Sequence, residues 1–308
     1  MTSAETVPAE APAVDATDIA AIFRDAGATG HLFAKEIGTD GPVISVGGDA
    51  PVVLASVFKI LVLTAFVRAV SAGDVDPLGR ATVTKRYRIG GVGFAGFSDD
   101  VEASWRDLAQ NMMTMSDNAA TDVVYHRLGG AAVQQVIDDL GLSRTRLIGC
   151  CEDLFASVLA DLGATDDADI DELLGSATPE QILGLGALDP QRTSASTPRQ
   201  IAALLEALWT DRAAPAEACA TARGIMAQQI WPHRLSSGFP SGVQIAAKTG
   251  TLPAWRNEAG VVTYPDGRQY AVAVFTRADS LADRQPLVDA SIGKAGFAAV
   301  ERIRTLTL

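Results

Sequence analysis

Hydrophobic and polar positions change their period several times along the chain. Apolar residues recur at helical spacing over 18–26, which predicts a helix. Residues 30–46 alternate as in two strands, with the turn sequence GTDG at 38–41 between them. The segment VFKILVLTAFVRAV (57–70) is apolar on nearly every face, which indicates a helix surrounded by protein. Residues 102–142 again follow a helical pattern, broken by glycines at 129–130 and 141.

The last third of the chain is richer in strand patterns. Ser196, Thr197 and Pro198 precede RQIAALLEALW, a helix start with a capping hydroxyl. After Gly242, the segments VQIAAKTG, AGVVTYP and QYAVAVFTR favour strands, the last two joined by a PDG turn. Residues 291–308 are expected to form a closing helix. Strands from both chain ends should therefore build one antiparallel sheet, flanked by helices, with an all-helical lobe inserted: an α+β architecture of the α/β-sandwich type.

This pattern predicts one domain with two lobes. Residues 1–16 are acidic and interrupted by proline, which indicates a disordered tail, and 17–308 form the domain. The helical lobe is expected over about 56–205, and the strand-rich lobe over 17–50 and 240–308. The N-terminal segment has neither a basic region nor an apolar core, so no signal peptide is predicted. No apolar run approaches the roughly 18 residues of a membrane span. A cytoplasmic location is expected.

Composition narrows the classes of partner. The 25 basic and 37 acidic residues give a net charge of −12, and no basic run is present, which argues against a nucleic-acid partner. An anionic substrate would need a local positive patch. The cysteines (150, 151 and 219) and the histidines (31, 126 and 233) show no disulfide or metal-ligand spacing, so neither a disulfide nor a metal site is expected. Cys150 and Cys151 are more typical of small buried residues than of reactive thiols.

The first chemical motif lies at the start of the apolar helix. Ser56 and Lys59 form an S-x-x-K tetrad, and positions i and i+3 share one helical face, so the Lys59 amine can approach the Ser56 hydroxyl. A lysine in an apolar surround tends to lose its proton, which gives a serine nucleophile with an amine base beside it. A capping serine followed by a surface lysine is the alternative interpretation.

Two further motifs follow in order. Ser116, Asp117 and Asn118 begin 60 residues after Ser56, and a Lys248-Thr249-Gly250 triplet ends a predicted strand. Taken alone, each motif is an ordinary turn, helix cap or strand end, and Asp117 is expected to be a structural loop residue. Together, the three motifs resemble those of the class A β-lactamases and penicillin-binding proteins. The resemblance covers about 18–308 and is strongest at both ends, and it implies that family's fold.

The resemblance implies a role for each matching residue. Ser56 would be the nucleophile, Lys59 its proton partner, and Ser116 the group that passes a proton to the leaving atom. Asn118 would bind a substrate amide, and the backbone N–H groups of Ser56 and Thr251 would form the oxyanion hole. A substrate carboxylate would contact the side chains of Lys248, Thr249 and Arg256, on or beside the KTG strand. Gly250 would form part of the edge of the same strand. Trp105 would be an aromatic gate or, equally, a packing residue on its helix.

The hydrolytic base of the family is harder to place. Glu152 lies 36 residues beyond Ser116, at the distance the resemblance implies, although a solvent-facing acid at a helix start is an open alternative. Phe155 and Ala156 stand where the family has leucine and asparagine. A long insertion over 157–193 follows and contains two rival acids, Glu172 and Glu180.

Together these observations predict a serine hydrolase. It would cleave a β-lactam or a related cyclic amide or ester through a Ser56 acyl-enzyme, with no cofactor. The substrate would be a small molecule with a carboxylate, and the protein would be a monomer. Three alternatives share the fold: a cytoplasmic biosynthetic or detoxifying esterase or amidase, a D,D-peptidase, and an inactive binding homologue.

Overall fold

The computed structural model describes residues 13–14, 16–165 and 170–307. Its strands are β1 (Ala13–Val14), β2 (Ala28–Glu36), β3 (Val43–Val46), β4 (Val52–Val53), β5 (Arg80–Val83), β6 (Val101–Ser104), β7 (Ala195–Ser196), β8 (Gln244–Leu252), β9 (Trp255–Thr263) and β10 (Gln269–Ala278). Its α-helices are α1 (Thr17–Asp25), α2 (Lys59–Ala72), α3 (Trp105–Thr114), α4 (Asn118–Leu128), α5 (Gly130–Asp139), α6 (Cys151–Asp161), α7 (Ile170–Ser176), α8 (Pro179–Leu183), α9 (Pro198–Trp209), α10 (Ala216–Met226) and α11 (Pro286–Leu306). Short 3₁₀ turns include η1 (Ala55–Phe58), which leads into α2.

The central sheet joins both ends of the described chain, as predicted. Its order is β1-β3-β2-β10-β9-β8, and every pairing is antiparallel except that of β1 with β3. The register sets Ala28 opposite Ala278 and Glu36 opposite Tyr270. These strands are rich in β-branched and small apolar residues, which suits a sheet that is covered on both faces.

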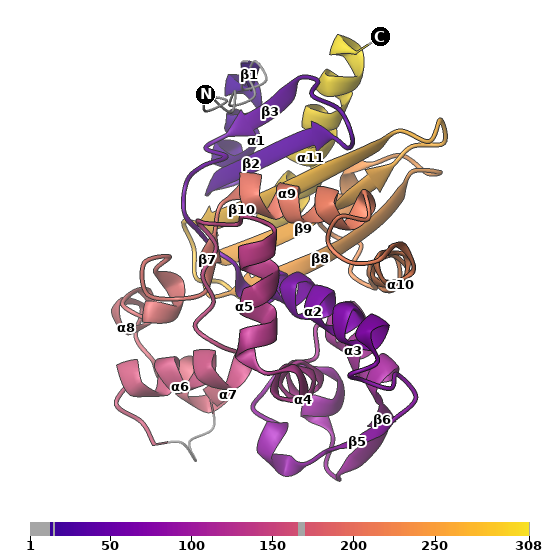
Figure 1. Cartoon of the computed structure of the whole chain (residues 1–308). Coiled ribbons are helices and arrows are strands. Elements are labelled where there is room, and N and C mark those ends of the chain that lie inside the picture. The colour runs from indigo at the N-terminus through magenta and orange to yellow at the C-terminus, as the bar shows by residue number, and fades with distance from the viewer. Residues whose placement is uncertain (1–12, 15, 166–169, 308) are drawn as a thin grey trace, which may run out of the picture.

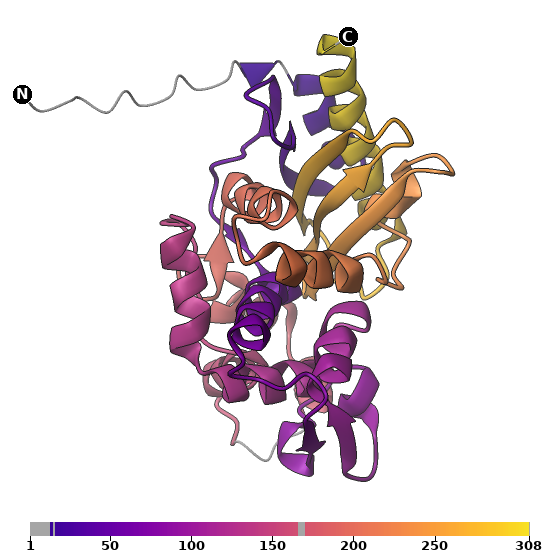
Figure 2. The same ribbon diagram turned by 45° about the vertical axis from the view of Figure 1, so that its right-hand side comes forward.

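Helices cover the two faces of this sheet (Figures 1 and 2). On one face α1 and α11 pack against β2, β3 and β10, where Ile19, Phe23 and Ile292 are fully or almost fully buried. On the other face α9 packs against β2, β9 and β10, and the core continues into the lobe of α2 to α8. The boundary between the sheet and the helical lobe is where β8 meets η1, so segments far apart in sequence join there.

The helix α2 has the buried character that its sequence predicts. Nine consecutive residues, 59–67, are buried, and Gly73 ends the helix in the left-handed conformation at φ 82°. Within the described residues, one helical stretch, Ala55–Ala72, is long and apolar enough to cross a membrane by length and composition. This differs from the expectation that no run approaches that length. Burial of 67% of this stretch inside the protein fits a core helix.

Several boundaries differ from the sequence prediction. Residues 80–83 and 101–104 pair as a two-stranded sheet that the helical pattern concealed. The final helix begins at Pro286 rather than 291, because proline is favoured in a first helical turn. Within the segment expected to be a disordered tail, Ala13–Val14 pair with β3 and Ala16 is buried. Residues 1–12 and 15 lie outside the described residues. The described part of the 157–193 insertion contains the end of α6, α7 and α8.

Candidate active site

The serine of the S-x-x-K motif lies on a tight turn between β4 and α2. Ala55 adopts a φ of 46°, a left-handed conformation that is uncommon for a residue with a side chain. Ser56 follows within η1 and is half-buried, whereas both of its neighbours are buried. Backbone strain of this kind is concentrated at functional sites because the surrounding structure must hold it in place. The turn therefore presents one polar side chain from an apolar segment.

Two residues of the neighbouring strands hold this turn. Asn257, fully buried on β9, donates from Nδ2 to the Val53 carbonyl at 2.8 Å and the Leu54 carbonyl at 3.4 Å. Gly250 on β8 lies so close that a Cβ there would stand 2.8 Å from the Leu54 carbonyl oxygen. A larger residue at position 250 would therefore push β8 away from Ser56. This close approach explains sterically why the KTG triplet has glycine at its third position.

Lys59 connects the first motif to the second. Its Nζ donates to the Ser116 carbonyl at 2.7 Å, to Asn118 Oδ1 at 2.9 Å and to Ser116 Oγ at 3.4 Å. Within the part of the chain that the structure describes, no hydrogen bond joins Lys59 Nζ to Ser56 Oγ. Ser116 has a φ of 62°, so the residue that accepts from Lys59 Nζ is strained, as Ala55 is. The predicted grouping of Lys59, Ser116 and Asn118 is thus present in the geometry.

Asp117 anchors the loop that carries Ser116 and Asn118. Its Oδ2 accepts from Phe94 N at 2.5 Å and from Asn111 Nδ2 at 2.6 Å, and its Oδ1 accepts from Ala120 N at 3.1 Å as the cap of α4. The side chain is fully buried, and burial raises the pKa of this carboxyl. The interpretation of Asp117 as a structural loop residue agrees with these contacts. Asn118 also donates from Nδ2 to the Gly90 carbonyl at 3.2 Å.

Burial disfavours the charged form of Lys59, and nearby acidic groups favour it. The side chain has no exposed surface, and burial lowers the pKa of its amine, an effect partly opposed by Cys151, Asp122 and Asp117. Cys151 is the nearest thiol to this cluster, with Sγ 3.4 Å from Asn118 Oδ1. Burial raises the pKa of the Cys151 thiol to about 12, so it is an inert neutral group here, as the expectation of a small buried residue requires.

Lys248 of the KTG triplet is a second fully buried amine. Its Nζ donates to the Thr249 carbonyl at 2.9 Å. Burial, followed by the nearby positive charge of Lys59, brings the pKa of Lys248 well below its ordinary value. The carboxylate of Glu258, also fully buried, acts in the opposite direction. Lys248 and Lys59 are therefore close enough for the charge of Lys59 to disfavour that of Lys248.

Arg234 is the cation that sequence reasoning missed. Its guanidinium donates to the carbonyls of Gly250 and Asn257, each at 2.9 Å, and to Thr251 Oγ1 at 2.8 Å. Asp289 pairs with its Nε at 2.7 Å. Arg234 comes from a turn before η5 (Leu235–Gly238) and not from a recognisable motif, so no sequence signal pointed to it. Its guanidinium supplies positive charge directly at the KTG strand.

Arg256, the predicted carboxylate ligand, is directed elsewhere. Its guanidinium donates to four backbone carbonyls, those of residues 252, 255, 282 and 283, and the residue is 5% exposed. These bonds tie β9 to the segment before α11. The geometry therefore argues against Arg256 as a substrate ligand, because its donors already serve the backbone. Thr249 and Gly250 are buried, and Thr251, at the Arg234 contact, is exposed.

Trp105 and the candidate acids also lie differently from the implied site. Trp105 begins α3 and packs over Gly79, which agrees with the packing alternative rather than with a gate. The Glu152 carboxylate is 44% exposed and lies 3.5 Å from His126 Nε2 and 3.7 Å from Arg86. It is not brought to the Lys59 cluster within the described residues, and it occupies the first turn of α6, as the alternative interpretation expects. Glu172 and Glu180 are exposed on α7 and α8.

The fold is that of the class A β-lactamases and related penicillin-binding proteins. A β-lactamase structure from Sphaerobacter thermophilus is 26% identical, with a TM-score of 0.73 over 95% of this chain and 99% of that chain. A structure of PBP-A, 22% identical, gives a TM-score of 0.74 over 96% and 100% of the two chains. A family model described as the beta-lactamase enzyme family matches residues 16–303, and the chain belongs to that family.

Two relatives of this chain carry different descriptions. The beta-lactamase regulatory protein BlaB of Streptomyces cacaoi is 28% identical over 298 residues, which is 92% of this chain and 95% of that protein. The extended-spectrum beta-lactamase PER-1 of Pseudomonas aeruginosa is 24% identical over 236 residues, 73% of this chain and 67% of that protein. The family thus includes both a hydrolase and a regulatory protein among relatives of this chain.

Proposed function

We propose that this protein is a penicillin-recognising serine hydrolase that acts through a Ser56 acyl-enzyme. The observation that supports this most strongly is the buried Lys59 amine, which contacts both Ser116 and Asn118 one helical turn from Ser56. Burial lowers the pKa of this amine, so a larger fraction of it is neutral and able to accept a proton than in an ordinary lysine, and Ser56 is the half-buried hydroxyl one helical turn before it. The family membership supports the same reaction class.

The proposed acylation balances with these groups alone. Ser56 Oγ attacks the carbonyl carbon while its proton passes to neutral Lys59 Nζ, and the carbonyl oxygen accepts bonds from the N–H groups of Ser56 and Thr251. The C–N bond then breaks, and the proton returns through Ser116 Oγ to the leaving nitrogen. The 3.4 Å separation of Lys59 Nζ and Ser116 Oγ suits that transfer.

We assign the substrate carboxylate to the exposed Thr251, with Arg234 behind it as the source of positive charge. Arg234 is as buried as Arg256, and most of its donors serve Asp289 and two backbone carbonyls, but its Nη2 donates to Thr251 Oγ1, a contact that Arg256 lacks. The Arg234→Ala variant is expected to raise KM about tenfold or more for carboxylate-bearing penicillins, because one charge-assisted contact is worth about 1.5–3 kcal/mol. Steady-state kinetics with a penicillin and with a neutral activated ester should separate binding from structural damage. Equal losses for both substrates would contradict the assignment, and Arg302→Ala, on the distant pair with Asp18, is the matched control.

Deacylation is expected to be slow. It requires a positioned water and a second base, and the Glu152 carboxylate lies with His126 and Arg86 instead of near Lys59. Rapid mixing with a chromogenic cephalosporin should give a burst of about one equivalent followed by slow turnover. General-base catalysis typically contributes at least about 10²-fold to a rate, and a carboxylate that lies away from Lys59 should contribute little of this. In protein treated with a chelator to remove metal, Glu152→Gln should therefore change the rate of the slow phase by less than about twofold.

Glu180→Gln, which changes an exposed acid on α8, is the matched control for that measurement. Burst-free rapid turnover would refute slow deacylation. A tenfold or larger loss confined to Glu152→Gln would instead restore Glu152 as the hydrolytic base.

The same geometry favours a second candidate function, a penicillin sensor. A long-lived acyl-enzyme suits a protein that reports antibiotic rather than destroys it, and BlaB of Streptomyces cacaoi is described as regulatory. The lifetime of the acyl-enzyme separates the two candidates: hydrolysis within seconds favours the enzyme, and persistence over hours favours the sensor.

A further inference from the structure

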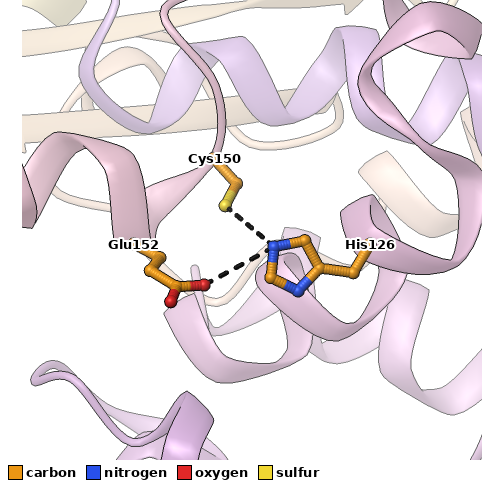
Figure 3. A group of neighbouring side chains, drawn as sticks. All are labelled: His126, Cys150 and Glu152. Atoms are coloured by element: carbon orange, nitrogen blue, oxygen red, sulfur yellow. Dashed lines mark hydrogen bonds and ion pairs between the residues drawn. The ribbon is translucent and has the colours of Figure 1, made fainter.

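Outside the Lys59 cluster, three side chains of metal-ligating type meet at the junction of α4 and α6. His126 lies in the last turn of α4, Cys150 caps α6, and Glu152 lies in the first turn of α6 (Figure 3). Their candidate ligand atoms all lie within 4.8 Å of one another. His126 and Cys150 are 24 positions apart in the sequence, which hid this group from sequence analysis; that analysis predicted no metal site.

Two of the three separations are close to those of a metal's coordination shell, and the third is at most 4.8 Å. Cys150 Sγ lies 3.8 Å from His126 Nε2, and the nearer Glu152 oxygen lies 3.5 Å from the same nitrogen. Bonds of about 2.3 Å from zinc to sulfur and about 2.0–2.2 Å to nitrogen and oxygen, at tetrahedral angles, place neighbouring ligand atoms roughly 3.3–3.6 Å apart. Small side-chain shifts would therefore suffice to bind an ion.

The geometry does not suit a Cys–His–Glu catalytic relay. A relay needs the nucleophile on one ring nitrogen and the carboxylate on the other. Here both contacts converge on Nε2, as the dashed lines in Figure 3 show. Three potential ligand atoms gathered within 4.8 Å of one another are instead what a bound cation requires.

Backbone hydrogen bonds hold the two ligands of α6 in place. Asp153 Oδ2 accepts from Cys150 N at 2.8 Å, and the two oxygens of Asp122 accept from Cys151 N at 2.8 Å and Glu152 N at 2.9 Å. These carboxylates also add negative charge beside the thiol. The Tyr87 ring lies 5.7 Å from the His126 ring, centre to centre. Ligands so held lose little freedom when an ion binds.

Exposure leaves a route for the ion. The side chains of His126 and Glu152 are 32% and 44% exposed, whereas Cys150 is buried. Arg86, 3.7 Å from the Glu152 carboxylate, opposes a cation, but its own side chain is 64% exposed and free to turn into solvent. The site is therefore reachable from water, with its sulfur ligand at the inner end.

We propose that His126, Cys150 and Glu152 bind a zinc ion, with a fourth position left for water or another small ligand. A set of one imidazole, one thiolate and one carboxylate suits zinc better than calcium or magnesium, which take oxygen ligands. Binding replaces the thiol proton of Cys150 with the metal and releases that proton to solvent. Zinc would also hold Glu152 at His126, away from Lys59.

Metal analysis tests this site without any activity measurement. Chelator-treated full-length protein is dialysed against zinc and then against metal-free buffer, and zinc per chain is measured. We expect about one equivalent for the unchanged protein and for Cys219→Ser, the control at the remote buried cysteine. Both Cys150→Ser and His126→Gln should weaken binding by at least tenfold.

Cobalt substitution provides a second readout. A Co²⁺–thiolate absorption band should form in the unchanged protein and in Cys219→Ser but disappear in Cys150→Ser. His126→Gln, at an exposed position, keeps the test valid if Cys150→Ser fails to fold. Failure of the unchanged protein to retain zinc, or retention unaffected by both variants, would overturn the proposal. Neither result depends on acylation of Ser56, so the site and the proposed function are tested separately.

Discussion

Replacing Ser56 with alanine is expected to abolish covalent labelling by penicillin. Ser56 is the half-buried hydroxyl on the strained turn before α2, and with its Oγ removed no acyl-enzyme can form there. Hydrolysis should fall at least about a thousandfold, to the residual rate that binding and oxyanion stabilisation supply. Intact-protein mass spectrometry after incubation with penicillin should show one adduct in the unchanged protein and none in the variant.

The exposed Ser143→Ala variant is the matched control and should be labelled normally. An adduct that maps to another residue, or labelling that survives in Ser56→Ala, would refute the nucleophile assignment.

Lys59→Met should have the second largest effect, a loss in the acylation rate of roughly 10² to 10⁴-fold, the usual contribution of a general base. The neutral amine is the active form, so kcat/KM for acylation should rise with pH as Lys59 loses its proton. Because burial lowers the pKa of Lys59, the midpoint of this rise should lie below the roughly 10.4 of an ordinary lysine. Stopped-flow acylation across pH measures it.

In Lys59→Met that limb of the pH profile should be absent. A profile that is unchanged in shape in the variant would show that another group titrates. Since Lys59 bridges Ser116 and Asn118, thermal unfolding of the variant must be measured beside its rate.

Prediction from the sequence was most accurate where a hydrophobic pattern and a chemical motif lie in the same segment. The apolar run of 57–70 required a buried helix, and the motif spacing grouped Lys59, Ser116 and Asn118, as the structure has them. The strands of both ends paired as expected because their β-branched patterns suit a covered sheet. The antiparallel pair of β5 and β6 was missed because four-residue strands carry too little periodicity to be recognised.

Side-chain direction and long-range neighbours were beyond the sequence. Arg256 has the right spacing after the KTG triplet, yet the backbone carbonyls within reach decide where its guanidinium points. Arg234 reaches Thr251 from a turn without a motif. Glu152 has the implied chain distance from Ser116, but its carboxylate contacts His126 and Arg86 instead of the Lys59 cluster. Each outcome depends on tertiary contacts that no local pattern encodes.

The central place of β2 in the sheet has a consequence for biosynthesis. Its partner β10 lies some 250 positions further along the chain, with Ala28 opposite Ala278, so the ribosome must release nearly the whole domain before this pairing can form. Until then β2 carries an unpaired edge, which invites association between nascent chains. Gly250 on β8 and Asn257 on β9 also arrive late, so until then the Ser56 turn lacks the strands that hold it. The acylation of Ser56 that we propose therefore requires that the last strands have emerged.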